Sequence, residues 1–173
     1  MNEYLQQYQQ RKGERRALVH SFSWAIPNEE ALEVIAKYSP LVEMGAGTGY
    51  WAKLLSERGV EIVCYDKYVG ETNPYKHYKH FFPINQGDEE ALKTLPTTYN
   101  LFLCWPCYDD PFARNCLANF KGSNLVYIGE GDGGCTGDDA FHEALETGWK
   151  LVEEFEIPQW QGLHDRGYVY QSK

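Results

Sequence analysis

Three glycines and one aspartate form the pattern with the clearest chemical meaning in this sequence. Gly45, Gly47 and Gly49 follow a short apolar segment, and a helical pattern begins directly after them. Glycine allows the backbone to take positive φ angles and to approach a ligand closely, and the N-terminus of a helix offers free N–H groups. Asp66 ends the next apolar segment, where its carboxylate can accept both hydroxyl groups of a ribose. The sequence therefore predicts a site for a nucleoside-containing ligand.

The glycine turn also discriminates between nucleoside ligands. The dinucleotide fingerprint G-x-G-x-x-G would need a glycine where the sequence has Tyr50, and a P-loop would need G-K-(S/T), which this turn lacks. Residues Glu43 to Gly49 instead read E-x-G-x-G-x-G. This pattern resembles that of the class I S-adenosylmethionine-dependent methyltransferases, and the resemblance extends over most of the chain.

The resemblance implies that the cofactor is S-adenosylmethionine. In that family the first acid and the glycine turn surround the methionine part, the acid after the second strand holds the ribose, and a polar site after the third strand meets the adenine. Carried over to this sequence, the implied cofactor contacts are Glu43, Gly45, Ala46, Gly47, Gly49, Trp51, Asp66, Lys67, Asp88 and Trp105.

The segment after the fourth predicted strand is where the family usually places the methyl acceptor. Residues 103–110 resemble the (D/N/S)-P-P-(Y/F/W) motif of amino-group methyltransferases, but Trp105 and Cys107 replace two of its positions. Trp105 cannot accept a hydrogen bond from a target N–H, whereas the carbonyl of Pro106 can, and Tyr108 can stack on a flat acceptor. Ordinary packing explains Trp105 and Tyr108 equally well.

Glu130 follows the fifth predicted strand and is a candidate base or anchor for an acceptor. An exposed loop acid is the alternative interpretation. The candidate catalytic residues are therefore Trp105, Pro106, Tyr108 and Glu130.

Other polar and aromatic residues predict no metal centre. His77 and His80 lack the spacing of a zinc site, and the Cys104–Cys107 pair has no second pair nearby, so we interpret both cysteines as small apolar side chains. Trp24 precedes a predicted helix and either covers the cofactor pocket or packs against the N-terminal segment.

The elements that must position these residues follow from periodicity and from turn residues. Predicted helices cover a marginal arm within 1–16 and the segments 29–37, 50–58, 88–95, 109–120 and 138–149; predicted strands cover 41–44, 60–65, 80–84, 100–104, 125–129, 151–157 and 167–171. Helices alternate with strands until the last two strands, which meet directly. This order predicts the α/β class, with a mostly parallel sheet, a C-terminal antiparallel hairpin and helices on both faces. The resemblance to the methyltransferases implies that this is the Rossmann-like class I methyltransferase fold.

Length and charge limit the possible partners. The chain has 173 residues, which fits one domain, with an N-terminal helical arm at 1–23 and a core at 24–173. A net charge of −9 repels phosphate backbones and disfavours nucleic acid, so a small molecule or a protein is the expected acceptor. No apolar run is long enough to span a membrane. Five cysteines at irregular spacing favour a reducing compartment, and we expect a cytoplasmic location.

The sequence thus predicts methyl transfer from S-adenosylmethionine to an unidentified acceptor. The first alternative is a non-catalytic module that keeps the fold and binds the cofactor or a partner, and the altered motif at Trp105–Tyr108 favours it. The second alternative is an NAD(P)-dependent oxidoreductase, which Tyr50 and the helix-free C-terminal hairpin disfavour.

Overall fold

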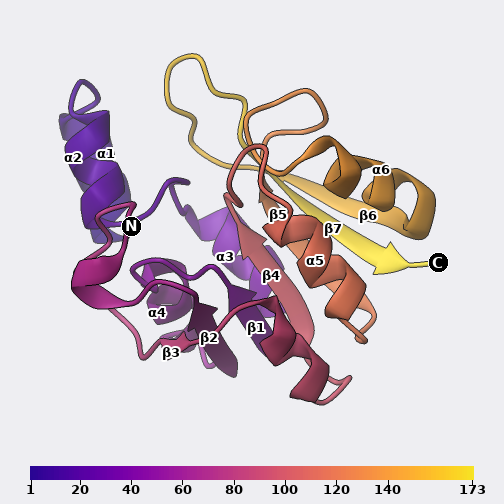
Figure 1. Cartoon of the computed structure of the whole chain (residues 1–173). Helices are drawn as coiled ribbons and strands as arrows, with labels where there is room; N and C mark the ends of the chain where they lie inside the picture. The colour runs from indigo at the N-terminus through magenta and orange to yellow at the C-terminus, as the bar shows by residue number, and fades with distance from the viewer.

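One seven-stranded sheet forms the centre of the molecule in the computed structural model, which describes all 173 residues (Figure 1). Its strands lie in the order β3-β2-β1-β4-β5-β7-β6. Strands β1 to β5 pair in parallel, and β7 runs antiparallel to both β5 and β6. This arrangement confirms the predicted parallel sheet with a C-terminal antiparallel hairpin. The strands are β1 (Leu41–Met44), β2 (Ile62–Asp66), β3 (Asn85–Gln86), β4 (Asn100–Cys104), β5 (Asn124–Gly129), β6 (Trp149–Glu156) and β7 (Arg166–Ser172).

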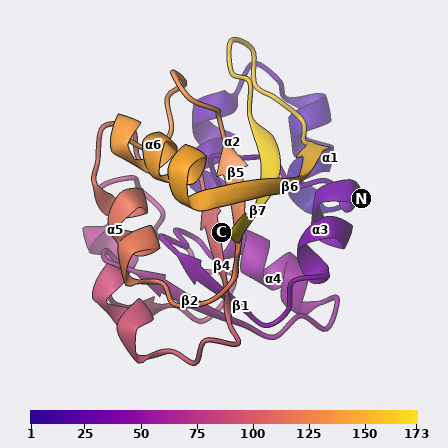
Figure 2. The same ribbon diagram turned by 90° about the vertical axis from the view of Figure 1, so that its right-hand side faces the viewer.

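Helices cover both faces of this sheet, as Figure 2 shows. They are α1 (Glu3–Gln10), α2 (Arg15–Ser21), α3 (Glu29–Ala36), α4 (Tyr50–Ser56), α5 (Phe112–Asn119) and α6 (Asp139–Gly148), with two 3₁₀ helices, η1 (Gly70–Thr72) and η2 (Glu89–Thr94). No helix is both long enough and apolar enough to cross a lipid bilayer.

The alternation of side chains along the central strands divides the core into two layers. Phe102 of β4 packs in the layer beneath α1 to α4, whereas its neighbours Leu101 and Leu103 pack in the layer beneath η2, α5 and α6. All three side chains are fully buried, as expected for a parallel strand covered on both faces. The sheet is therefore held rigidly, and its strand ends are fixed in position.

The N-terminal arm consists of two short helices, α1 and α2, rather than the single helix predicted within 1–16. Asn2 caps α1 by accepting a hydrogen bond from the Leu5 N–H at 2.9 Å. The buried Tyr4 ring stacks on Phe22 with centroids 4.8 Å apart. The Tyr8 hydroxyl donates to the Gln159 carbonyl at 2.8 Å, which ties the arm to the C-terminal loop. The arm is thus packed against the core.

The region between β2 and β4 departs most from the sequence prediction. The predicted strand at 80–84 is wrong: Pro83 lacks an N–H, and the Phe81 N–H donates to the Thr48 carbonyl of the glycine turn at 2.8 Å. The two-residue β3 at 85–86 takes its place, and the predicted helix at 88–95 is the 3₁₀ helix η2. The predicted helix at 109–120 begins later, at 112, directly after Pro111.

Candidate functional site

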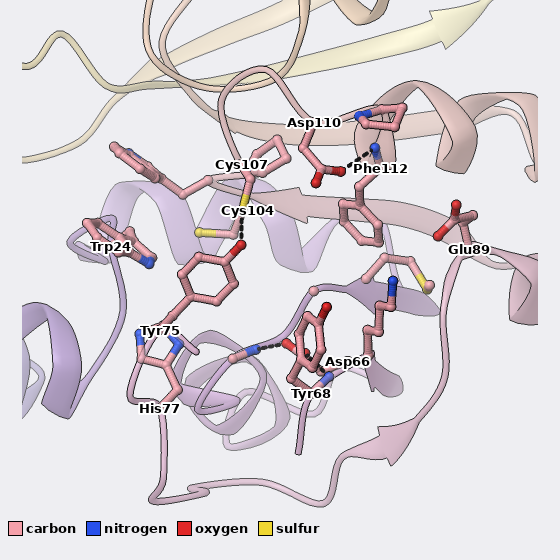
Figure 3. A pocket seen from close by; sticks show the side chains of 17 residues that line it. Trp24, Asp66, Tyr68, Tyr75, His77, Glu89, Cys104, Cys107, Asp110 and Phe112 are labelled. Carbon is pink, nitrogen blue, oxygen red and sulfur yellow. Dashed lines mark hydrogen bonds between the residues drawn. The ribbon is translucent and has the colours of Figure 1, made fainter. Parts of the chain in front are cut away.

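A pocket of about 300 Å³ opens at the carboxyl ends of β1, β2 and β4 (Figure 3). Five segments line it: the glycine turn after β1, the irregular segment after β2, the start of η2 after β3, the segment between β4 and α5, and the stretch after the arm that contains Trp24. In parallel α/β sheets this edge is where ligands bind. The fold therefore brings the sequence motifs at 43–49, 66–67 and 103–107 to one place.

The glycine turn forms the floor of the pocket because its residues are glycines. Gly45, Gly47 and Gly49 have φ angles of +72°, +58° and +69°, which side chains disfavour. A Cβ atom at Gly47 would lie 2.6 Å from Nδ1 of His77, and one at Gly45 would lie 3.2 Å from the Phe112 ring. Glycine is thus required here both by backbone conformation and by close packing.

Asp66 joins the glycine turn to the segment that follows β2. Its Oδ2 accepts a hydrogen bond from the Gly47 N–H at 2.8 Å, and its Oδ1 accepts one from the Tyr68 N–H at 2.8 Å. Burial raises the pKa of Asp66, and these two N–H groups oppose that rise. Each carboxylate oxygen keeps a further acceptor position, so the side chain can still receive hydroxyl groups from a ligand.

Glu43 lies beneath the glycine turn and does not line the pocket. Burial raises its pKa to about 8, so the carboxyl is largely protonated at neutral pH. Its Oε2 lies 3.6 Å from Sγ of Cys64, which donates to it. Glu43 is therefore a buried, largely neutral group rather than an acid that lines the pocket.

Three other residues implied as cofactor contacts lie behind the lining. Trp51 is 1% exposed, packs edge-on against Phe102 with centroids 6.0 Å apart, and belongs to the hydrophobic core. The buried face of α4 points toward the sheet and the arm rather than toward the pocket. Trp51 therefore does not reach the place where the cofactor contact was implied. Ala46 and Gly49 complete the turn without lining the pocket.

The acid that lines the pocket after β3 is Glu89 rather than the implied Asp88. Asp88 caps η2 instead, because its Oδ1 accepts a hydrogen bond from the Glu90 N–H at 3.1 Å. Lys67, the other implied contact after β2, does line the pocket.

Trp105 forms one wall of the pocket together with Trp24. The two indole rings stack with centroids 4.8 Å apart and an interplanar angle of 11°. Nε1 of Trp105 donates to Oδ1 of the fully buried Asp165 at 2.9 Å. The Arg15 guanidinium lies 5.9 Å from the Trp24 ring centroid. The arm and the loop between β6 and β7 thus fix this wall from two sides.

Asp165 predicts a pH-dependent contribution to stability. Burial raises its pKa from 3.8 to about 6, so the folded state binds its proton more tightly than the unfolded chain does. Between about pH 4 and pH 6 this carboxyl therefore lowers the free energy of unfolding as the pH rises. Asp165→Asn stays neutral and can keep the bond from Trp105. We expect the free energy of unfolding of the variant, relative to the unmodified protein, to rise by about 1–3 kcal/mol across this range.

Urea titrations of both proteins at several pH values check this expectation. Because both chains share every other titratable group, the difference between them isolates Asp165. A difference that stays constant from acidic to neutral pH would show that Asp165 is not held in this way.

Pro106 and the two cysteines continue the same wall. The Pro106 carbonyl already accepts a hydrogen bond from the Gly137 N–H at 3.1 Å and keeps one further acceptor position. Cys104 and Cys107 are free thiols and only half-buried, and burial raises the pKa of each. The Cys107 thiol donates to the Tyr75 hydroxyl at 2.9 Å, and Figure 3 shows the Tyr75 side chain pointing across the pocket toward it. Neutral thiols thus line the pocket, where small apolar side chains were predicted.

Two of the candidate catalytic residues do not line the pocket. The Tyr108 side chain is 65% exposed and lies outside it. Glu130 is buried rather than an exposed loop acid: Oε2 accepts from the Cys135 N–H and Oε1 from the His164 N–H, both at 2.7 Å. Burial acts to raise the pKa of Glu130, but these bonds outweigh it and the pKa is lowered. Glu130 therefore holds two loops together as a carboxylate.

Sequence reasoning missed several residues that line the pocket, among them Tyr68, Tyr75, His77, Glu89 and Phe112. His77 is 5% exposed, its Nε2 has no hydrogen-bond partner, and burial lowers its pKa to about 4, so the ring is neutral at neutral pH. Tyr75 and His77 lie in an irregular segment without periodicity, and no local pattern identifies them. No group of three or more His, Cys, Asp or Glu side chains is arranged to hold a metal ion.

Comparison with known proteins finds likeness in structure only. No family model matches the sequence, and no curated protein matches it. Among solved structures, the chain resembles a 1,6-didemethyltoxoflavin-N1-methyltransferase from Burkholderia thailandensis with a TM-score of 0.55, 15% identity, and coverage of 84% of this chain and 77% of that one. That protein was crystallised with bound 1,6-didemethyltoxoflavin and S-adenosylhomocysteine.

Two further solved structures show the same likeness. A magnesium protoporphyrin IX methyltransferase from Synechocystis PCC 6803, with bound S-adenosylmethionine, matches with a TM-score of 0.52, 12% identity, and coverage of 100% of this chain and 85% of that one. A glycopeptide N-methyltransferase complexed with S-adenosylhomocysteine matches with a TM-score of 0.52, 12% identity, and coverage of 88% and 91%. The chain therefore has the class I methyltransferase fold.

Proposed function

We propose that this protein is an S-adenosylmethionine-dependent methyltransferase whose cofactor binds in the pocket at the strand ends. The observation that carries the proposal is the hydrogen bond between Asp66 and the Gly47 N–H. Asp66, which we assign to the ribose, is thereby held directly against a turn whose backbone conformation and packing favour glycine. The same fold in three methyltransferases supports this assignment.

The residues of the pocket suit the charge and shape of this cofactor. Asp66, Glu89 and Asp110 line it, and Lys67 is the one lysine or arginine among the lining residues. An acidic lining attracts a ligand that carries a sulfonium and an ammonium group. The neutral ring of His77 adds no opposing charge.

Within this pocket we assign three roles. The backbone at Gly45 and Gly47 would hold the methionine part, Asp66 the ribose, and the surfaces of Lys67 and Phe112 the adenine. The bound cofactor would supply a methyl group that its sulfonium already activates. The task of the protein is then to align a nucleophile and to exclude water.

The stacked wall of Trp24 and Trp105 is the proposed acceptor side. Its rings are held by Asp165 and Arg15, so they offer a rigid flat surface. The remaining acceptor position of the Pro106 carbonyl can receive a hydrogen bond from an acceptor N–H or O–H. We therefore retain Trp105 and Pro106 as proposed acceptor contacts and omit Tyr108 and Glu130. The five free cysteines suit a reducing compartment, and we propose the cytoplasm.

Transfer of a labelled methyl group tests this function. Purified protein is incubated with methyl-tritiated S-adenosylmethionine and fractions of a cell extract, and label in macromolecules and small molecules is counted. We expect label to enter one fraction, and Trp105→Ala to lower this incorporation more than it lowers cofactor affinity. Cofactor binding without transfer into any fraction would favour the non-catalytic alternative, and binding of a nicotinamide dinucleotide in its place would favour the oxidoreductase.

A further inference from the structure

Positive charge is concentrated in two chain segments of this acidic protein. Residues 11–20 and 67–80 contain seven of the 16 lysines and arginines, but only two of the 25 acidic residues, Glu14 and Glu71. The rest of the chain keeps nine basic and 23 acidic residues. The net charge of −9 therefore describes the body of the protein and not these segments.

The two segments lie side by side, and the second of them reaches the pocket. Burial lowers the pKa of His20, and the nearby charges of Lys76 and Arg16, one from each segment, lower it further. Phe22, directly after α2, stacks on Phe81 with ring centroids 5.8 Å apart. Figure 1 shows the segment around η1 passing close to α1 and α2. Part of 67–80 also lines the pocket, so the positive surface continues to its opening.

Most of these cations have no acidic partner. Arg16, Lys67, Lys76 and Lys79 are exposed and form no ion pair with a carboxylate; we call these four residues the basic rim. Elsewhere the typical cation is paired, as in Lys37, Lys53, Arg58, Lys93 and Arg166. The rim is therefore available to an anionic ligand.

Exposed tyrosines alternate with the lysines of the rim. Tyr68, Tyr75 and Tyr78 are 39%, 39% and 53% exposed, and each is adjacent in sequence to a rim lysine. Exposed aromatic rings among cations are the features that bind single-stranded nucleic acid, because bases stack on the rings while phosphates pair with the cations. Three such pairs, together with Arg16, offer several contacts, whereas a single phosphate group would use only one or two.

We propose that the methyl acceptor is a single-stranded nucleic acid that lies on the basic rim and brings one unpaired base to the wall formed by Trp24 and Trp105. This inference rests on the proposed function, since it names the acceptor of the same site. The acidic lining serves the cationic cofactor, and the three rim residues outside the lining, Arg16, Lys76 and Lys79, serve the anionic acceptor, with Lys67 at the boundary between the two. This proposal departs from the prediction that the net charge of −9 disfavours nucleic acid, because binding depends on the electrostatic field near the contact surface and not on the net charge alone.

Fluorescence anisotropy with a labelled single-stranded RNA of about 12 nucleotides tests the proposal without a methyl donor. We expect binding that weakens with salt between about 50 and 200 mM, with a slope of log affinity against log salt of about −2 to −3. Lys76→Glu combined with Lys79→Glu should lower the affinity at least about tenfold. The control combines Lys121→Glu with Lys150→Glu, which changes the net charge by the same amount on exposed, unpaired lysines away from the pocket. It should lower the affinity for RNA less than about threefold.

Further arms separate nucleic acid from other anions. Tyr78→Ala should weaken RNA binding at least about fivefold without changing the salt slope, because it removes stacking alone. Single-stranded DNA of the same sequence shows whether the sugar matters. The proposal would be overturned if both double variants lost the same affinity for RNA, or if no RNA bound at low salt. It would also be overturned if polyglutamate displaced the labelled RNA as well as unlabelled RNA does, or if a mononucleotide bound as tightly as the RNA.

Calorimetry on the same samples keeps the two proposals distinguishable. The Lys76→Glu and Lys79→Glu double variant should bind S-adenosylmethionine within about twofold of the unmodified protein, because neither lysine lines the pocket. Cofactor binding without RNA binding would overturn the acceptor class alone. RNA binding without cofactor binding would overturn the proposed function.

Discussion

Asp66→Ala is expected to lower the affinity for S-adenosylmethionine by about 5- to 150-fold, which corresponds to about 1–3 kcal/mol. The substitution removes the acceptor for ribose hydroxyls. It also leaves the Gly47 and Tyr68 N–H groups without the carboxylate that accepts from them at 2.8 Å. Calorimetric titration of the folded variant measures the loss.

Asp139→Ala is the matched control for this variant. It removes the same charge from an exposed position in the first turn of α6, outside the pocket, and should leave the affinity unchanged. Circular dichroism shows whether the Asp66 variant has kept its fold. If a folded Asp66→Ala protein binds the cofactor as tightly as the control does, Asp66 does not hold the ribose.

Gly47→Ala is expected to have the second large effect, on stability and binding together. The residue has φ +58°, where alanine is strained by about 1–2 kcal/mol. The added Cβ would also lie 2.6 Å from Nδ1 of the buried His77, so the ring or the turn must move. Because the same residue donates to Asp66, we expect cofactor affinity to fall at least about tenfold, with a further loss of about 1–3 kcal/mol in the free energy of unfolding.

Gly59→Ala separates strain from crowding. Gly59 has φ +81°, but a Cβ atom there would meet nothing within 4 Å. This variant should lose only the strain energy and should bind the cofactor normally. Adding His77→Ala to Gly47→Ala should restore part of the stability by removing the crowded ring. Equal destabilisation by the Gly47 and Gly59 substitutions would mean that the contact with His77 is not as close as described.

The glycine turn and Asp66 could be predicted from the sequence because their meaning is local. A turn between a buried strand and a helix requires glycine whatever packs around it, and the carboxyl ends of neighbouring parallel strands must meet at one edge of the sheet. The alternation of helices and strands along the chain and the C-terminal hairpin follow from the same regular elements. These features are fixed by short-range pattern.

The errors lie where a contact depends on the path of an irregular segment. Tyr75 and His77 reach the pocket because the segment after β2 folds back over the glycine turn, and no periodicity describes such a path. Asp88 was implied as the adenine contact, but its side chain caps η2, and the next residue, Glu89, lines the pocket instead. Trp51 shows the converse: helical spacing identified its buried face correctly, but not what that face contacts.

A crystal structure of the protein grown with S-adenosylmethionine tests the central claim most directly. The account predicts density for the cofactor in the pocket, with its ribose hydroxyls on the Asp66 carboxylate and its methionine part along Gly45 and Gly47. Density for the cofactor at another place, or a pocket that stays empty at saturating cofactor, would contradict it.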